Sequence, residues 1–330
     1  MLFSKLKNYI VMKKNALLTL LLLCPVLFFT SCEKDDLDSE FKIEGLTIDN
    51  YPRVDGSTST APLNTLVACK LLGISYQWET LYDGSRSIVP KLNNNSDKFW
   101  ELVKSSQTHQ SFINLINKDA DIILTAREMS PDEKLYANSQ GVNLIETPIA
   151  LDAFVFIVHP DNPIKSLSIK QIQDIYTGKI TNWREVGGND AKINPYVRNP
   201  NSGSQELMES LVMKGLNSPE FPVSYEFQPI FSMMMTMEYV SFDVNAICYT
   251  VYYYKETILR DVIYKTKSIG INGTNPNMES ISMNTYPLVA DVYAVIRSDL
   301  DKSSMAYKLY ELLKTRAGRR AIRASGYLTK

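Results

Sequence analysis

The chain has 330 residues, 45% of them hydrophobic, and its 35 basic and 36 acidic residues give a formal charge of −1. This length allows one large core or two domains of ordinary size. A nearly neutral chain lacks the basic excess that nucleic-acid binding needs, so we expect no nucleic-acid partner. The two histidines have no zinc-ligand spacing, and we expect neither a metal nor a cofactor.

Residues 1–31 are predicted to be an export signal. Lys13 and Lys14 precede an apolar run at residues 16–29, and Thr30-Ser31-Cys32 follows it. The run is shorter than the roughly 20 residues of a spanning helix, and the pattern resembles a bacterial lipoprotein signal with Cys32 as the lipidated residue. An ordinary secretory signal, cleaved elsewhere, is the alternative. Loss of residues 1–31 removes four lysines and no acid, so the formal charge moves from −1 to −5.

Residues 32–44 are predicted to be a polar tether. Glu33-Lys34-Asp35-Asp36, directly after the cysteine, resembles the acidic export tag of surface lipoproteins, and a solvated charged linker is the alternative. We therefore expect a protein anchored by lipid at the cell envelope, at the periplasmic face or on the outer-membrane surface.

Strands alternate with helices in the rest of the chain, which predicts an α/β fold. One helix has Pro62 in its first turn and ends at Gly73. Cys69 and Cys248 lie in apolar contexts, so we expect buried free thiols rather than a disulfide. Strands are expected at residues 48–54, 121–124, 155–158, 246–254 and 289–296, and further helices at residues 112–117, 169–176 and 304–318.

Clusters of hydroxyl residues follow several of these strands. The clusters are DGSTSTAP at residues 55–62, DIILTARE at residues 121–128, RNPNSGS at residues 198–204 and the weaker SSQT at residues 105–108. Ligands of open α/β sheets lie beyond the carboxyl ends of the strands, so we expect these clusters to meet there. Each cluster alone is also compatible with a capping turn or an exposed loop.

The third cluster carries the clearest binding signal. Arg198 stands on a short loop, and Ser202-Gly203-Ser204 opens an amphipathic helix, with Ser202 as the N-cap and Gln205 completing a capping box. Free backbone N–H groups at a helix start, the positive end of the helix dipole and a planar guanidinium together favour a tetrahedral oxyanion. The sequence therefore predicts anion capture before it predicts catalysis.

Five segments in the expected order carry a family resemblance. They are GSTSTAPL, DIILTAREMSPDE, VFIVHPDNPIKSLSIKQIQDIYTGKITNW, RNPNSGSQELM and NTYPLVADVYAVI. They resemble the phosphate-binding proteins of the high-affinity phosphate ABC transporter, in the type II periplasmic-binding-protein superfamily. The resemblance implies mixed sheets flanked by helices and two lobes, residues 45–148 with 289–330 and residues 149–288, joined by two crossover strands that form a hinge. It also implies a monomer that serves an ABC permease.

The resemblance also implies a phosphate-binding set. Arg198 would be the main cation, and the other expected ligand residues are Ser59, Thr60, the N–H of Ala61, Thr108, Arg127, Ser202, Gly203 and Ser204. Ala126 stands where the family commonly has an Asp, or in one branch a Ser, and that Asp accepts a proton from the ligand. Without a carboxylate there, discrimination between phosphate and sulfate is open.

A binding protein fits these residues better than an enzyme. A nucleophilic Ser202 or Ser204 would need a base, usually histidine, and neither His109 nor His159 stands in a recognisable motif. Several charge-assisted hydrogen bonds of about 1.5–3 kcal/mol suffice for a micromolar Kd, which needs about −8 kcal/mol. We expect capture of phosphate or a related oxyanion for ABC-transporter uptake. The alternatives are a surface anion-binding or sensory protein without a permease, and a serine hydrolase or phosphatase.

Overall fold

The computed structural model describes residues 40–92, 96–216 and 229–330. The predicted signal, Cys32 and most of the predicted tether lie outside the described residues. Residues 41–330 form one compact unit. Within the described ranges, no helix is both long enough and apolar enough to cross a membrane.

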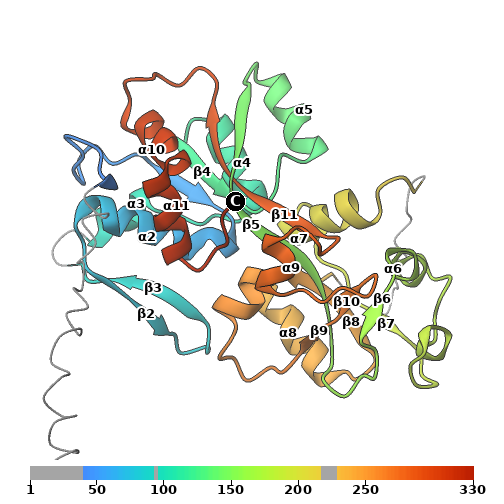
Figure 1. Ribbon diagram of the computed structural model, residues 1–330. Coiled ribbons are helices and arrows are strands. Elements are labelled where there is room, and N and C mark those ends of the chain that lie inside the picture. Colours follow the sequence, from blue (N-terminus) through green and yellow to red (C-terminus); the bar gives the residue numbers. More distant parts are fainter. Residues whose placement is uncertain (1–39, 93–95, 217–228) are drawn as a thin grey trace, which may run out of the picture. The chain divides into compact units, whose positions relative to one another are not determined.

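Seven strands of the described chain form one mixed sheet (Figure 1). They are β1 (Val54–Gly56), β4 (Ile122–Thr125), β5 (Leu144–Val158), β7 (Asn194–Pro195), β8 (Ala246–Val251), β9 (Lys267–Ser268) and β11 (Val289–Arg297). The order is β1-β4-β11-β5-β8-β7, and β9 also pairs with β5. The pairs β1/β4 and β7/β8 are parallel, and the other pairs of this sheet are antiparallel.

The long strand β5 runs through both parts of this sheet. Its residues 144–153 pair with β11, whereas residues 154–158 pair with β8. We call the part with β1, β4 and β11 the first half-sheet, and the part with β7, β8 and β9 the second half-sheet. Residues 149–158 are all buried, as expected of a nearly continuous apolar run. The division into two lobes stays a prediction, and the change of partner within β5 lies close to its first boundary.

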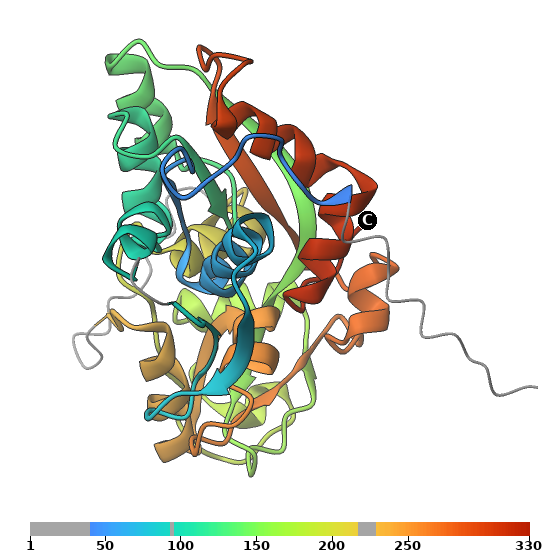
Figure 2. The same ribbon diagram turned by 90° about the vertical axis from the view of Figure 1, so that its left-hand side faces the viewer.

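Helices accompany each half-sheet (Figures 1 and 2). Beside the first lie α2 (Ala61–Leu72), α3 (Ser96–Leu102), α4 (Thr108–Ile116), α5 (Pro131–Ser139), α10 (Met305–Lys314) and α11 (Arg316–Ala324). Beside the second lie α6 (Ile169–Tyr176), α7 (Gly203–Leu207), α8 (Met233–Phe242) and α9 (Met278–Ser282). Shorter elements are η2 (Thr58–Thr60), η3 (Trp183–Val186), η4 (Met208–Val212), η5 (Tyr254–Ile258), the hairpin β2 (Tyr76–Thr80) with β3 (Arg86–Pro90), and the pair β6 (Ser166–Leu167) with β10 (Gly270–Ile271).

Buried aromatic rings fill the core beside the second half-sheet. Phe154 and Phe156 from β5 contact Tyr249 from β8 with ring centroids 5.3 and 5.9 Å away, and Tyr176 from α6 lies 5.8 Å from Tyr249. These rings meet tilted or edge to face, the geometries that aromatic pairs favour. The packing fixes the Tyr249 hydroxyl, which holds part of the site described below.

Several expected elements are confirmed. The helix that begins near Pro62 ends at Gly73, whose φ of +66° favours glycine. The predicted helix at residues 169–176 is α6. Cys69 and Cys248 are buried free thiols, as expected.

Several expected boundaries are wrong, including the following three. The strand predicted at residues 48–54 begins only at Val54. The predicted strand at residues 246–254 ends at Val251, and a π-helical turn starts at Tyr254. The helix predicted at residues 304–318 is interrupted at Thr315, which has extended backbone geometry and whose hydroxyl caps α11 by accepting a hydrogen bond from the N–H of Gly318. Hydroxyl side chains compete in this way with helical hydrogen bonding.

Asp152 is buried where β5 changes partner. One carboxylate oxygen accepts hydrogen bonds from the N–H groups of Ala153 (2.8 Å) and Tyr253 (2.9 Å), and the other has no partner among the described residues. Desolvation raises the pKa of Asp152 from 3.8 to about 7.

The raised pKa of Asp152 predicts a pH dependence of stability. The folded state keeps the proton after the unfolded chain has lost it, so the contribution of Asp152 to the free energy of unfolding should fall between about pH 4 and pH 7 and then level off. We expect Asp152→Asn to flatten this decline in urea unfolding measured across that range. An unchanged slope in the variant would contradict the assignment to Asp152.

Candidate functional site

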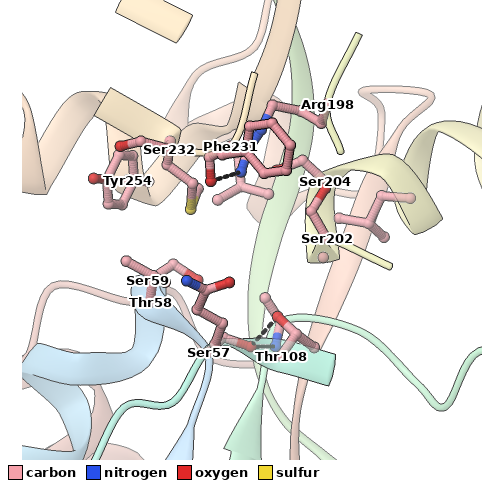
Figure 3. A pocket seen from close by; sticks show the side chains of 16 residues that line it. Ser57, Thr58, Ser59, Thr108, Arg198, Ser202, Ser204, Phe231, Ser232 and Tyr254 are labelled. Carbon is pink, nitrogen blue, oxygen red and sulfur yellow. Dashed lines mark hydrogen bonds between the residues drawn. The ribbon is translucent and has the colours of Figure 1, made fainter. Parts of the chain in front are cut away.

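A cavity of about 170 Å³ lies where the hydroxyl clusters meet (Figure 3). Its polar lining consists of Ser57, Thr58, Ser59, Gln107, Thr108, Arg198, Ser202, Ser204 and Ser232. Its other lining residues are Ala126, Gly203, Leu207, Phe231, Met233, Val251 and Tyr254. Among the described residues, the lining therefore contains one basic side chain and no aspartate or glutamate.

In the described part of the chain, four helices begin at or beside this cavity, two beside each half-sheet. The turn η2 leads directly into α2, and α4 begins at Thr108. Ser202 is the N-cap of α7, and Ser232 is the N-cap of α8. The first N–H groups of a helix have no partner within the helix, and this end carries partial positive charge. Four helix starts on one small cavity favour a negatively charged ligand.

The guanidinium of Arg198 is buried and incompletely hydrogen-bonded. Its Nε donates to the carbonyl of Ile230 (2.7 Å) and one terminal nitrogen donates to the carbonyl of Phe231 (3.2 Å). The other terminal nitrogen has no partner among the described residues. Arg198 is only 4% exposed, and desolvation lowers its pKa. No described carboxylate forms an ion pair with Arg198, so this buried cation is suited to an incoming anion.

Ser202 and Gly203 set the geometry of the α7 end. The Ser202 hydroxyl accepts a hydrogen bond from the N–H of Gln205 (3.1 Å), which confirms the predicted N-cap. The predicted capping box is wrong, because the Gln205 side chain instead accepts a hydrogen bond from the Tyr249 hydroxyl. That same hydroxyl accepts the N–H of Arg198 at 3.0 Å. A Cβ on Gly203 would lie 2.6 Å from the Thr108 hydroxyl, so glycine allows the starts of α7 and α4 to approach closely.

The wall of the cavity opposite α7 is stabilised by hydrogen bonds between its own residues. Ser57 and Thr108 share a hydrogen bond of 2.8 Å, and the N–H of Ala126 donates to the Ser57 hydroxyl at 3.0 Å. Asp55 lies behind this wall, and its carboxylate accepts from the N–H of Ser106 (2.7 Å) and from the Asn114 amide (2.7 Å), as well as from its neighbour Gly56. Its two oxygens are therefore already engaged by the protein.

The cavity brings together most of the predicted ligand residues. Ser59, Thr108, Arg198, Ser202, Gly203 and Ser204 all line it. Thr60 does not, because its hydroxyl donates to the carbonyls of Ser57 (3.0 Å) and Leu124 (2.7 Å), and Ala61 starts α2 beside it. Ligand contact stays a prediction for every residue of the set.

Arg127 lies outside this cavity, in a buried ion pair. Its two terminal nitrogens donate to the carboxylate of Glu133 at 2.7 and 2.8 Å, and its guanidinium lies 5.5 Å from the centre of the Phe112 ring. It lines a separate hollow of about 450 Å³. Its charge is therefore balanced by Glu133, unlike that of Arg198.

Several lining residues were not among the predicted ligand residues. Ser57 and Thr58 belong to the first hydroxyl cluster and Gln107 to the weaker one. Their proximity in sequence to the predicted ligand residues could have identified them. Ser232 directly before an apolar helix is an N-cap signal. Nothing in the sequence points to Tyr254, which the end of β8 brings to the cavity.

Comparisons with known proteins show the family of this chain. A family model of a PBP superfamily domain matches residues 80–310. The phosphate-binding protein PstS of Borreliella burgdorferi is 26% identical over 241 residues, which cover 72% of this chain and 81% of that protein. PstS of Bacillus subtilis is 24% identical over 172 residues, which cover 52% of this chain and 53% of that protein.

Two solved structures share the fold. A putative phosphate ABC transporter substrate-binding protein with bound phosphate from Clostridium perfringens has a TM-score of 0.61 and 23% identity, covering 84% of this chain and 98% of that one. An ABC-type phosphate transport receptor from Vibrio cholerae has a TM-score of 0.59 and 23% identity, covering 84% and 99%. The predicted α/β fold of type II periplasmic binding proteins is confirmed.

Proposed function

This chain belongs to the PBP superfamily, and we propose that it captures phosphate or a related tetrahedral oxyanion outside the cytoplasm. The observation that carries the proposal is the buried Arg198, with an unpaired N–H and no counter-ion among the described residues, at a cavity where four helices begin. The relatives are named as phosphate-binding proteins and as a phosphate transport receptor, and these names indicate phosphate as the anion.

Binding in this cavity would rest on donors from both walls. Arg198 and the start of α7, with Ser202, Gly203 and Ser204, would hold the anion from one side. The hydroxyls of Ser59 and Thr108 would hold it from the other side. No lining residue in the described part of the chain is a histidine or a carboxylate that could activate a serine, so the ligand would be bound without covalent change.

The role proposed for the whole protein is based on its resemblance to the phosphate-binding proteins of ABC transporters. Residues 45–148 with 289–330, and residues 149–288, would act as two lobes that close on the anion. The helix starts support this, because two come from each side of the cavity. We infer a monomer that delivers its ligand to an ABC permease and is held at the envelope by lipid on Cys32, with residues 32–44 as the tether.

Calorimetric titration of the purified chain with inorganic phosphate near neutral pH tests this function. We expect one site with a Kd of about 1 µM or tighter, equivalent to about −8 kcal/mol. Acetate at the same concentration is the control, because it is an anion without tetrahedral geometry. Absence of any binding at millimolar phosphate would contradict the proposal.

A further inference from the structure

The C-terminal segment of the chain reaches the side of the cavity that Ser59 lines. Tyr327 is only 2% exposed, and its hydroxyl donates a hydrogen bond of 3.0 Å to the backbone carbonyl of Ser59, 268 residues earlier in the chain. Ser59 lies beside Thr58, on the side of the cavity opposite Arg198 (Figure 3). A side chain from the far end of the sequence therefore binds the backbone of a predicted ligand residue.

A proline leaves the turn that carries Ser59 short of one backbone donor. Ser59 lies in the 3₁₀ turn η2, and Pro62 follows in the first turn of α2. Proline has no N–H, so Pro62 cannot donate to the carbonyl three residues before it, as a continued 3₁₀ turn would require. The hydroxyl of Tyr327 supplies a donor to this carbonyl from outside the turn. A bond that fixes the Ser59 backbone also fixes the direction in which its side chain leaves that backbone.

Tyr327 is itself held firmly in place. Its ring stacks on that of Tyr253, with centroids 3.7 Å apart and planes 13° apart. The N–H of Leu151 in β5 donates to the carbonyl of Leu328 at 2.8 Å, which ties the backbone next to Tyr327 to the sheet. Burial raises the pKa of Tyr327 well above its usual value of 10, so its hydroxyl keeps the proton that it donates. A donor fixed in this way can position the group that it binds.

We propose that Tyr327 is a positioning residue for anion binding, whose hydroxyl holds the Ser59 backbone so that the Ser59 hydroxyl points at the anion. Tyr327 itself is not part of the cavity lining. The inference rests on the proposed function, because it assumes that Ser59 donates to the ligand. A donor that is already ordered in the free protein does not have to be ordered on binding, so loss of this hydrogen bond should lower affinity as well as stability.

Removal of single hydroxyl groups tests this role. Tyr327→Phe keeps the buried ring, and we expect it to weaken phosphate binding in calorimetry by about three- to tenfold, the range for one neutral hydrogen bond. Tyr253→Phe is the matched control, because the Tyr253 hydroxyl also belongs to a buried ring and donates to a backbone carbonyl, that of Ser325, at 2.6 Å. Both variants should lower the unfolding temperature to a similar extent, but Tyr253→Phe should leave the Kd unchanged.

A double-mutant cycle with Ser59→Ala separates positioning from general destabilisation. Ser59→Ala removes the hydroxyl that Tyr327 is inferred to orient and keeps the carbonyl that Tyr327 binds. In this background we expect Tyr327→Phe to change phosphate affinity by less than about twofold, because the group to be positioned is absent. A loss of the same size with and without Ser59→Ala would overturn the inference.

The outcomes also distinguish the inference from the proposed function. If phosphate binds the wild-type protein and Tyr327→Phe equally well, the inference is wrong and phosphate capture stands. The same conclusion follows if Tyr253→Phe weakens binding as much as Tyr327→Phe. If the wild-type protein does not bind phosphate, both ideas are wrong.

Discussion

Replacement of Arg198 by alanine is expected to weaken phosphate binding by roughly 30- to 4,000-fold. Truncating one partner of a buried, hydrogen-bonded charge pair costs about 2–5 kcal/mol, and each 1.4 kcal/mol is a factor of ten in Kd. Arg198 is the only basic side chain among the described residues that line the cavity. The four helix starts would remain, so we expect weak residual binding rather than none.

Replacement of Arg198 by methionine should affect the stability of the ligand-free protein differently. A buried cation without a counter-ion destabilises the fold, and its lowered pKa reflects this desolvation. Arg198→Met keeps most of the side-chain volume and removes the charge. We therefore expect thermal unfolding of ligand-free Arg198→Met at or above the wild-type temperature, together with loss of the upward shift that phosphate gives the wild type.

Lys134→Ala provides the matched control for Arg198. Lys134 lines the neighbouring hollow and is exposed, so the variant removes one positive charge without changing the cavity. Its phosphate affinity should stay within about twofold of wild type at ordinary ionic strength, because exposed charges are screened. Near-normal affinity in Arg198→Ala, or equal losses in the two variants, would contradict the assignment of the site to Arg198.

The two arginines show what local sequence can and cannot determine. Arg127 and Arg198 both lie in hydroxyl-rich segments that carry the family resemblance, and both were predicted ligand residues. Glu133, six residues after Arg127, lies in the first turn of α5 and engages the Arg127 guanidinium. Arg198 is instead held by two backbone carbonyls from residues 230 and 231, a pairing that leaves one nitrogen free. Only the tertiary structure shows that the charge of Arg127 is balanced by a carboxylate, whereas that of Arg198 has no counter-ion among the described residues.

Helix starts were easier to predict than the partners of individual side chains. Ser202 and Pro62 carry position-specific signals that depend on a few neighbouring residues, and both were placed correctly. Gln205 has the sequence of a capping-box residue, yet Tyr249 from β8 binds its side chain instead. Tyr254 reaches the cavity because β8 ends at Val251. Such contacts depend on strand ends that local propensity does not fix.

Sulfate is expected to bind this protein with a Kd within about tenfold of that for inorganic phosphate. Within the described ranges no carboxylate lines the cavity, and the oxygens of nearby Asp55 are engaged by N–H donors. Nothing therefore repels a fully ionised dianion, and no strong acceptor rewards the proton that hydrogen phosphate keeps. Competition between sulfate and phosphate in calorimetry near neutral pH measures the ratio.

Ala126→Asp should introduce discrimination between phosphate and sulfate. Ala126 lines the cavity, and its N–H donates to the Ser57 hydroxyl, so the backbone that would carry the new carboxylate is already fixed. Facing an anion, this carboxylate would accept the P–OH proton but repel sulfate, and like charges in contact cost several kcal/mol. We expect sulfate affinity to fall by roughly 100-fold or more while phosphate affinity changes far less. Ala126→Asn, which has the same shape without the charge, should retain sulfate binding. Strong preference for phosphate in the wild-type protein would contradict this account, because rejection of sulfate would then come from a group outside the cavity lining.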